Sequence, residues 1–225
     1  MGIWAEIKHA LNSTLGTDEF MSLDNMINEV KNILVGGKIE YTSGGTYEFE
    51  VPANITYIKA IVVGAGGGGS SGGTGASGKA NTGGAGGSKG EYFEGLFSVK
   101  PKQKIQVIVG IGGSGGQGGT TSRYSGSNGE ATVLTGLVTV AGGNGGASGY
   151  TGDSGNGQPG ENCTELGTNG GYGGNSGYTG NPAGDGENGS GGGGGGGSTY
   201  SNTTVGAGGR GGDGYVKIIW GVHVI

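Results

Sequence analysis

The sequence predicts a mainly β protein with short N-terminal helices, a β-sandwich base and a bundle of packed, extended helices rich in glycine. Apolar residues recur every three to four positions in the first 35 residues, which indicates helix, and then every second position, which indicates strands. Glycine supplies 64 of the 225 residues, and long glycine tracts separate the strands. We therefore divide the chain into residues 1–37, a helical segment for attachment or oligomerisation, and residues 38–225, a glycine-rich domain.

The N-terminal segment carries two apolar stripes. The first contains Ile3, Trp4, Ile7 and Leu11, and the second contains Leu23, Met26, Ile27, Val30 and Leu34. Gly36 and Gly37 follow and are natural helix stops. Because short isolated helices are marginally stable, we expect the first stripe to mediate assembly with another protein or with copies of the chain. Packing against the chain's own sandwich is the alternative.

Short strands begin where the helical pattern ends. From Lys38 onward the apolar period changes to that of a strand, and Pro52 ends the first run. Further runs rich in β-branched and aromatic residues follow. The predicted strands are residues 47–51, 55–63, 92–99, 104–109, 131–134, 137–140 and 215–220. Many short strands separated by turns predict a β-sandwich.

The glycine tracts between the strands are too poor in apolar residues to form a hydrophobic core. Residues 64–90 contain no Val, Ile, Leu, Met, Phe or Trp. Glycines recur every three positions in local runs, for example at 66, 69, 72, 75 and 78 and again at 143, 146, 149, 152 and 155. Three residues per turn is the period of a polyproline-II-type helix, whose backbone groups need neighbouring chains as partners. The period predicts helices that bond to one another; disorder is the alternative.

No catalytic, cofactor or metal site is predicted. Residues 64–69 match the G-x-G-x-x-G dinucleotide pattern after a strand, but no helical pattern follows, and residues 206–211 match it equally well. Residues 73–79 imitate a phosphate-binding loop, but Ala80 stands where Ser or Thr must bind magnesium. The side chains of His9, His223 and Cys163 are isolated in the sequence. We expect a protein that is not an enzyme and needs no cofactor.

The charge distribution narrows the expected partners. Six acidic residues and one basic residue, Arg210, lie between Ala141 and Asp213, so this stretch accounts for the net charge of −5. A chain without a basic face is not expected to bind nucleic acid. No run approaches the ~18 apolar residues of a membrane span, so membrane insertion is not expected either. Residues 1–8 do not form a secretory signal, which predicts synthesis in a bacterial cytoplasm without a signal peptide.

Several segments resemble the glycine-rich domains of bacteria and phages. They are FEVPANIT at 49–56, IVVGAGGGG at 61–69, SVKP at 98–101, VIVGIGG at 107–113 and GGDGYVKI at 211–218, and the similarity covers about residues 45–220. Similar modules are known in tail-fibre tip adhesins of tailed phages and in anaplastic lymphoma kinase receptors, but the receptor would require a signal peptide and cysteines. The resemblance implies that the glycine tracts form packed polyglycine-II helices. Lys102 stands where the family often has glycine.

The opening of the chain, residues 3–8 and 12–16, resembles the start of phage or prophage tail proteins of Gram-positive bacteria. Together the two resemblances imply a host-receptor-binding adhesin at the tip of a phage or prophage tail fibre, located in the virion tail or an extracellular assembly. The implied partners are a bacterial cell-surface receptor, protein or glycan, and another tail-fibre protein or the chain itself through its N-terminal helices. A structural appendage or self-assembling filament subunit on the same scaffold is the alternative.

The expected path of the chain predicts where a receptor would bind. If strands run outward into glycine tracts that later return, loops 77–82, 121–128, 158–168 and 198–204 converge at one distal end, and residues 181–182 return to the base. Loops on a rigid scaffold are where binding residues concentrate. The expected receptor-binding residues are Lys79, Asn81, Arg123, Tyr124, Glu161, Asn162, Glu165, Leu166, Tyr200 and Asn202. The alternative is that these loops are only polar turns.

Overall fold

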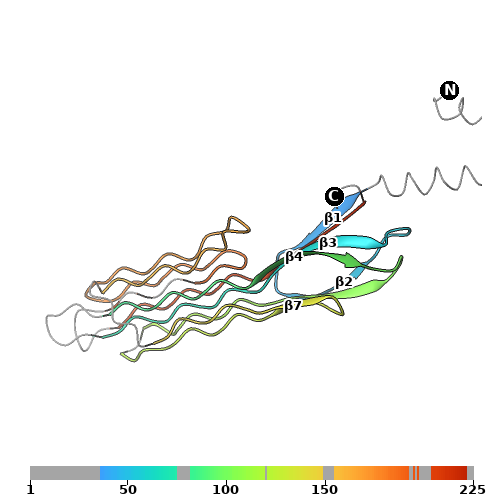
Figure 1. Cartoon of the computed structure of the whole chain (residues 1–225). Helices are drawn as coiled ribbons and strands as arrows, with labels where there is room; N and C mark the ends of the chain where they lie inside the picture. Colours follow the sequence, from blue (N-terminus) through green and yellow to red (C-terminus); the bar gives the residue numbers. More distant parts are fainter. Residues whose placement is uncertain are drawn as a thin grey trace, which may run out of the picture.

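Two antiparallel sheets form the base of the molecule. The computed structural model describes residues 36–74, 82–119, 121–148, 155–192, 195, 197 and 204–221. One sheet, called sheet A here, has the order β1-β8-β3-β4, and the other, sheet B, has the order β2-β5-β6-β7 (Figure 1). The strands are β1 (Gly37–Tyr41), β2 (Gly45–Glu50), β3 (Tyr57–Val63), β4 (Tyr92–Ser98), β5 (Lys104–Val109), β6 (Thr132–Leu134), β7 (Val138–Val140) and β8 (Tyr215–Trp220).

The hydrophobic core lies between the two sheets. Alternate residues of each strand point into it, as the period of two requires: Ile58, Ala60 and Val62 of β3 are fully buried. The facing side chains of sheet B include Ile105, Val107 and Val109 of β5. The apolar residues that the sequence places in strands therefore build one contiguous core at one end of the molecule.

The predicted fold class was wrong in its N-terminal helices. The described part of the chain is mainly β, with two antiparallel sheets and no α-helix. Residues 1–35, where the helices were expected, lie outside the described residues. An apolar spacing of three to four is weak support for a helix by itself, because most helical stability in proteins comes from tertiary packing.

The glycine tracts continue from the strands as a bundle of extended segments (Figure 1). Outward segments, which run away from the sheets, are 64–73, 110–119, 141–148, 168–177 and 190–197 as far as it is described. Inward segments are 82–91, 121–130, 155–162, 180–189 and 204–214. Their backbone groups bond to other segments, as the three-residue period requires of chains without internal hydrogen bonds.

Segment 64–73 lies at the centre of a ring of six others. Its N–H groups donate in turn to three inward segments: residues 64, 67, 70 and 73 to 82–91, residues 65, 68 and 71 to 124–130, and residues 66, 69 and 72 to 206–212. Its carbonyl groups accept from three outward segments, through N–H groups of residues 113 and 116, 143 and 146, and 192 and 195. Neighbours around the ring also bond to one another, for example Ser127 N to Ser114 O at 2.8 Å.

This packing explains why two of every three residues are glycine. In segment 110–119 the exposed residues that carry a side chain are Ile111, Ser114 and Gln117, three apart, while glycine fills 112, 113, 115, 116 and 118. A Cβ on any of these five glycines would lie less than 3.0 Å from backbone of a neighbouring segment. In this outer segment the positions that carry side chains are therefore those that face solvent.

Candidate functional site

The distal end of the bundle, opposite the sheets, presents the turn that contains Arg123 and Tyr124. Residues 74, 82, 148, 155, 197 and 204 also lie at this end. Arg123 and Tyr124 are both exposed, and the Tyr124 side chain is 42% accessible. The guanidinium of Arg123 lies against Gly73, where a Cβ would overlap it. The two side chains therefore lie at the distal end of the central segment.

Ser71 of the central segment fixes the backbone of Tyr124. Its N–H donates to the Tyr124 carbonyl at 2.9 Å, and its buried hydroxyl oxygen accepts from the Tyr124 N–H at 2.8 Å. Thr121, in the same turn, is also held in place, because its carbonyl accepts a hydrogen bond from the Thr74 hydroxyl at 3.3 Å. Tyr124 is thus held on both sides of its peptide while its ring remains exposed.

Ser71→Ala should loosen this turn without unfolding the bundle. Removing the hydroxyl leaves the part-buried Tyr124 N–H without its acceptor, which costs ~1 kcal/mol, the lower part of the range for a buried donor. We expect faster amide hydrogen exchange at Tyr124 and a melting temperature lower by several degrees. The matched control is Ser114→Ala, because the Ser114 hydroxyl pairs with the exposed Ser127 hydroxyl at 2.9 Å. Equal exchange at Tyr124 in both variants would contradict the role of Ser71.

Four other predicted residues lie at the opposite end of the bundle. Residues 158–168 were expected at the distal end, but the chain runs inward along 155–162 and turns beside the sandwich, where Cys163 and Thr168 form a β-bridge. The expected return of residues 181–182 to the base is also wrong, because Gly180 N donates to Thr204 O at the distal end. The residues separated from Arg123 and Tyr124 are Glu161, Asn162, Glu165 and Leu166.

The turn beside the sandwich, residues 161–168, is called the sandwich-end turn here, and side-chain hydrogen bonds and an ion pair hold it in place. Lys89 Nζ lies 2.6 Å from Glu165 Oε1, and this contact, together with a backbone hydrogen bond, lowers the pKa of Glu165 to about 2. The same bond to Glu165 raises the pKa of Lys89. Asn162 Oδ1 accepts from Gly170 N at 2.8 Å, and Glu161 Oε2 accepts from Lys89 N at 3.2 Å. These side chains hold the turn together and are poorly placed to contact a ligand at the distal end.

Cys163 is enclosed within the same turn. Its side chain is fully buried, and its N–H donates to the Ser190 hydroxyl at 3.0 Å. Burial raises the pKa of the Cys163 thiol, although the Leu166 N–H opposes this. A buried thiol that is protonated at neutral pH is a weak nucleophile. Cys163 therefore acts as a small apolar side chain in the packing of this turn.

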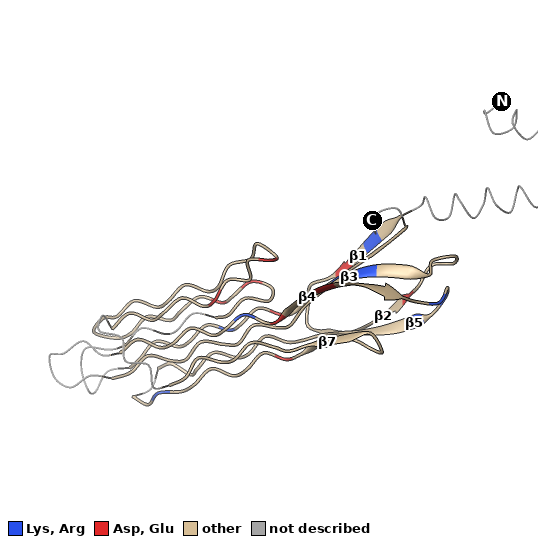
Figure 2. Cartoon of the chain, in the orientation of Figure 1, with Lys and Arg blue, Asp and Glu red and all other residues tan. Residues whose placement is uncertain are grey.

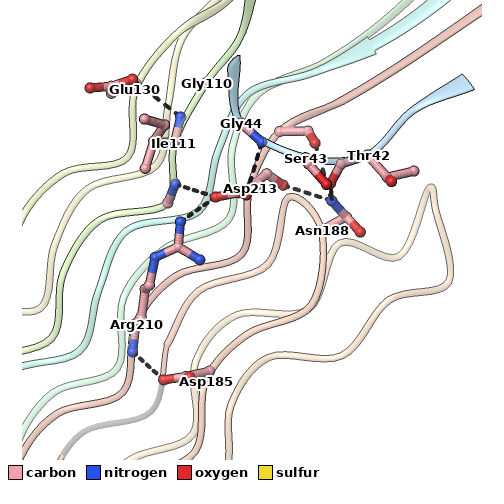
Figure 3. A network of polar contacts seen from close by, with 12 residues as sticks. Thr42, Ser43, Gly44, Gly110, Ile111, Glu130, Asp185, Asn188, Arg210 and Asp213 are labelled. Atoms are coloured by element: carbon pink, nitrogen blue, oxygen red, sulfur yellow. Dashed lines mark hydrogen bonds and ion pairs between the residues drawn. The ribbon is translucent and has the colours of Figure 1, made fainter.

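A polar network around Asp213 joins the bundle to the sandwich (Figure 3). Its carboxylate accepts from Gly112 N and Gly44 N, each at 2.9 Å, and pairs with Arg210. Burial alone would raise the pKa of Asp213, but these hydrogen bonds together lower it. Asn188 Nδ2 donates to Thr42 O at 2.6 Å and ties an outer segment to the link between β1 and β2. The network connects four parts of the chain: residues 42–44, Gly112, Asn188 and residues 210–213.

Acidic and amide side chains serve the bundle as hydrogen-bond acceptors. Some N–H groups of one segment donate to a side-chain oxygen of a neighbouring segment instead of to a backbone carbonyl. Asn128 accepts from Gly145 N, Asn156 from Ser176 N, Asp185 from Arg210 N, Glu187 from Asn169 N, Glu130 from Ile111 N and Glu91 from Ala141 N, at 2.7–3.2 Å. The bundle carries few charges, and they are mainly acidic (Figure 2). Asp185 and Glu187, two of the acidic residues of 141–213, therefore serve as acceptors for backbone N–H groups of the bundle.

Several predicted residues lie outside the described part of the chain. They are the receptor-binding candidates Lys79, Asn81, Tyr200 and Asn202 and the assembly candidates Ile3, Trp4, Ile7 and Leu11. Sequence reasoning also missed Tyr172 and Tyr178, whose side chains are 71% and 69% exposed on the outer segment 168–177 and the turn after it. Their six-residue separation is twice the glycine period, which is the signal that could have marked them as outward positions.

Within the described residues, no group of three or more His, Cys, Asp or Glu side chains is arranged to hold a metal ion. The same part of the chain has no helix long and apolar enough to cross a membrane.

Comparison with known families places the chain by its sequence. A search of curated proteins returns no match. The family model of the glycine-rich domain matches residues 42–165, more than half of the chain. The matched part includes β2 to β7, the central segment and the turn that carries Arg123 and Tyr124. The chain belongs to the glycine-rich domain family.

Proposed function

We propose that the protein is a host-receptor-binding adhesin at the tip of a phage or prophage tail fibre, acting by binding and not by catalysis. The glycine bundle is a rigid support, and the distal end is the receptor-binding end. The sequence resemblances to tail-fibre adhesins and tail proteins support the setting. The receptor in this proposal is a protein or a glycan on the bacterial surface.

The observation that carries the proposal is the fixed display of Arg123 and Tyr124. Both side chains are exposed, while the backbone beneath them bonds to Ser71 in the centre of the bundle. A preorganised site loses little conformational entropy on binding. Tyr and Arg are also the residues most enriched among those that dominate binding energy. The described sandwich-end turn offers no such display, because its charged groups bond to one another.

The test measures binding of the full chain to bacterial cells. A fluorescently labelled protein is first screened on a panel of Gram-positive strains to find one that it binds. On that strain, Arg123→Ala and Tyr124→Ala should each weaken binding at least about tenfold, because such anchors contribute ~2 kcal/mol or more. The melting temperature should stay within about two degrees of the wild type, because both side chains are exposed.

Leu166→Ala, in the sandwich-end turn, and Tyr172→Ala, on the flank, are the matched controls and should bind like wild type. If both distal variants keep wild-type binding, the distal end is not the receptor site. If the wild-type chain binds no strain and instead polymerises alone, it is a filament subunit, which is the alternative function.

A further inference from the structure

We propose that residues 1–35 of the chain dock on the outer face of sheet A. This face consists of the side chains of β1, β8, β3 and β4 that point away from sheet B. They alternate with core residues such as Ala60 and Ile218. The outer face contains Lys38, Glu40, Tyr57, Lys59, Ile61, Glu94, Leu96, Lys217 and Ile219.

The outer face exposes two large apolar side chains among its charged residues. Leu96 is 58% exposed and Tyr57 54% exposed, and both side chains lie on this face. One cross-strand row places Lys59 between Leu96 of β4 and Ile219 of β8. A hollow of about 420 Å³ adjoins Leu96, lined by Lys59, Glu94, Gly95 and Leu96. Large apolar side chains grouped on one face of a sheet indicate an interaction surface.

The N-terminal segment enters at the opposite edge of the same face. A second hollow, of about 460 Å³, is lined by Gly36, Gly37, Lys38, Lys217 and Ile219. Residue 35 is bonded directly to Gly36, so the preceding residues must start from this hollow. Leu34 lies two residues from it and cannot be more than ~7 Å of extended chain away. The apolar residues close to this entry are Leu23, Met26, Ile27, Val30 and Leu34.

The opposite charges of residues 1–35 and of the outer face of sheet A also favour this docking. Residues 1–35 contain five carboxylates and two lysines, which gives 2 − 5 = −3. The outer face carries Lys38, Lys59 and Lys217, and its two carboxylates already pair with them, as in Lys59–Glu94 at 2.7 Å and Lys217–Glu40 at 3.4 Å. Lys38 shares Glu40 with Lys217, also at 3.4 Å, so the net charge of these five residues is 3 − 2 = +1. Covalent attachment gives the segment a local concentration in the millimolar range, which favours it over a second copy.

The test is limited trypsin digestion of the full chain, following cleavage after Lys8 and Lys31 by mass spectrometry. A synthetic peptide of residues 1–35 supplies the unprotected rate. Cleavage after Lys31 should be at least about tenfold slower in the full chain, because proteolysis follows the population of the open state. Leu96→Asp and Ile219→Thr should each bring the rate to within about threefold of the peptide. Tyr172→Asp, an exposed substitution on the bundle, should keep the wild-type rate.

Three results would overturn the proposal. The first is a wild-type rate equal to that of the peptide. The second is protection that neither substitution in sheet A reduces. The third is protection that disappears on dilution, which would make a second copy the occupant. Comparing the cleavage rate of the wild-type chain with that of the peptide still tests the first result if a variant fails to fold.

Discussion

Gly68→Ala should prevent the glycine bundle from packing. Gly68 lies in the middle of the central segment, where its N–H donates to Ser127 O and its carbonyl accepts from Gly146 N. A Cβ there would lie 2.7 Å from Gly113 O and closer still to Ser114 O. Both are backbone atoms held by their own hydrogen bonds, so they cannot turn aside as a side chain would. We expect a loss of at least ~3 kcal/mol, the upper part of the range for overpacked sites.

Thermal unfolding measures this effect. A loss of ~3 kcal/mol corresponds to a fall of ~6–12 °C in melting temperature for a domain of this size. Ser114→Thr is the matched control, because it also adds one methyl group but at an exposed position of a neighbouring segment. Its melting temperature should stay within about two degrees of wild type. A Gly68→Ala protein as stable as Ser114→Thr would mean that the segments are not packed against segment 64–73.

The sequence predicted the sandwich well because the strands obey simple rules. The run of β-branched residues at 104–109 coincides with β5, and the predicted strand 215–220 coincides with β8. Both strands alternate between buried and partly exposed side chains, which is the pattern that burial on one face imposes. The three-residue glycine period also predicted correctly that the tracts bond to one another. The helices expected in residues 1–35 could not be predicted by a similar rule, because the stability of a short helix depends on a packing partner that the sequence does not identify.

The order of segments in the bundle could not be predicted. Every segment has the same period and nearly the same composition, so the sequence does not distinguish one neighbour from another. No proline lies between segments 141–148 and 155–162 to mark the change of direction, and this led to the wrong placement of Glu161 and Glu165. The Lys89–Glu165 ion pair is likewise a contact between residues 76 positions apart. The turn around Arg123 was easier to place because it lies between two segments that lead directly from β5 and into β6.

Asp213→Ala should cause the second large loss of stability. The carboxylate satisfies two backbone N–H groups, one from the link before β2 and one from segment 110–119, and it also pairs with Arg210 (Figure 3). Hydrogen bonds to a charged group contribute ~1.5–3 kcal/mol each, so the substitution should cost ~3 kcal/mol. The melting temperature at pH 7 should fall by ~6–12 °C. Asp185→Ala is the control with a smaller expected effect, because that exposed carboxylate accepts from a single backbone N–H, that of Arg210.

The effect of Asp213→Ala should depend on pH in a defined direction. Because the pKa of Asp213 is lowered in the folded chain, its ionised form stabilises the fold at pH values above the ordinary aspartate pKa of ~3.9. This stabilisation is lost as the pH falls through the lowered pKa, since the carboxyl group is then protonated in both states. The difference in melting temperature between wild type and Asp213→Ala should therefore be largest at pH 5–7 and should shrink toward pH 2. A difference that stays constant down to pH 2 would show that the loss comes from packing, and that the charge of Asp213 does not hold the bundle to the sandwich.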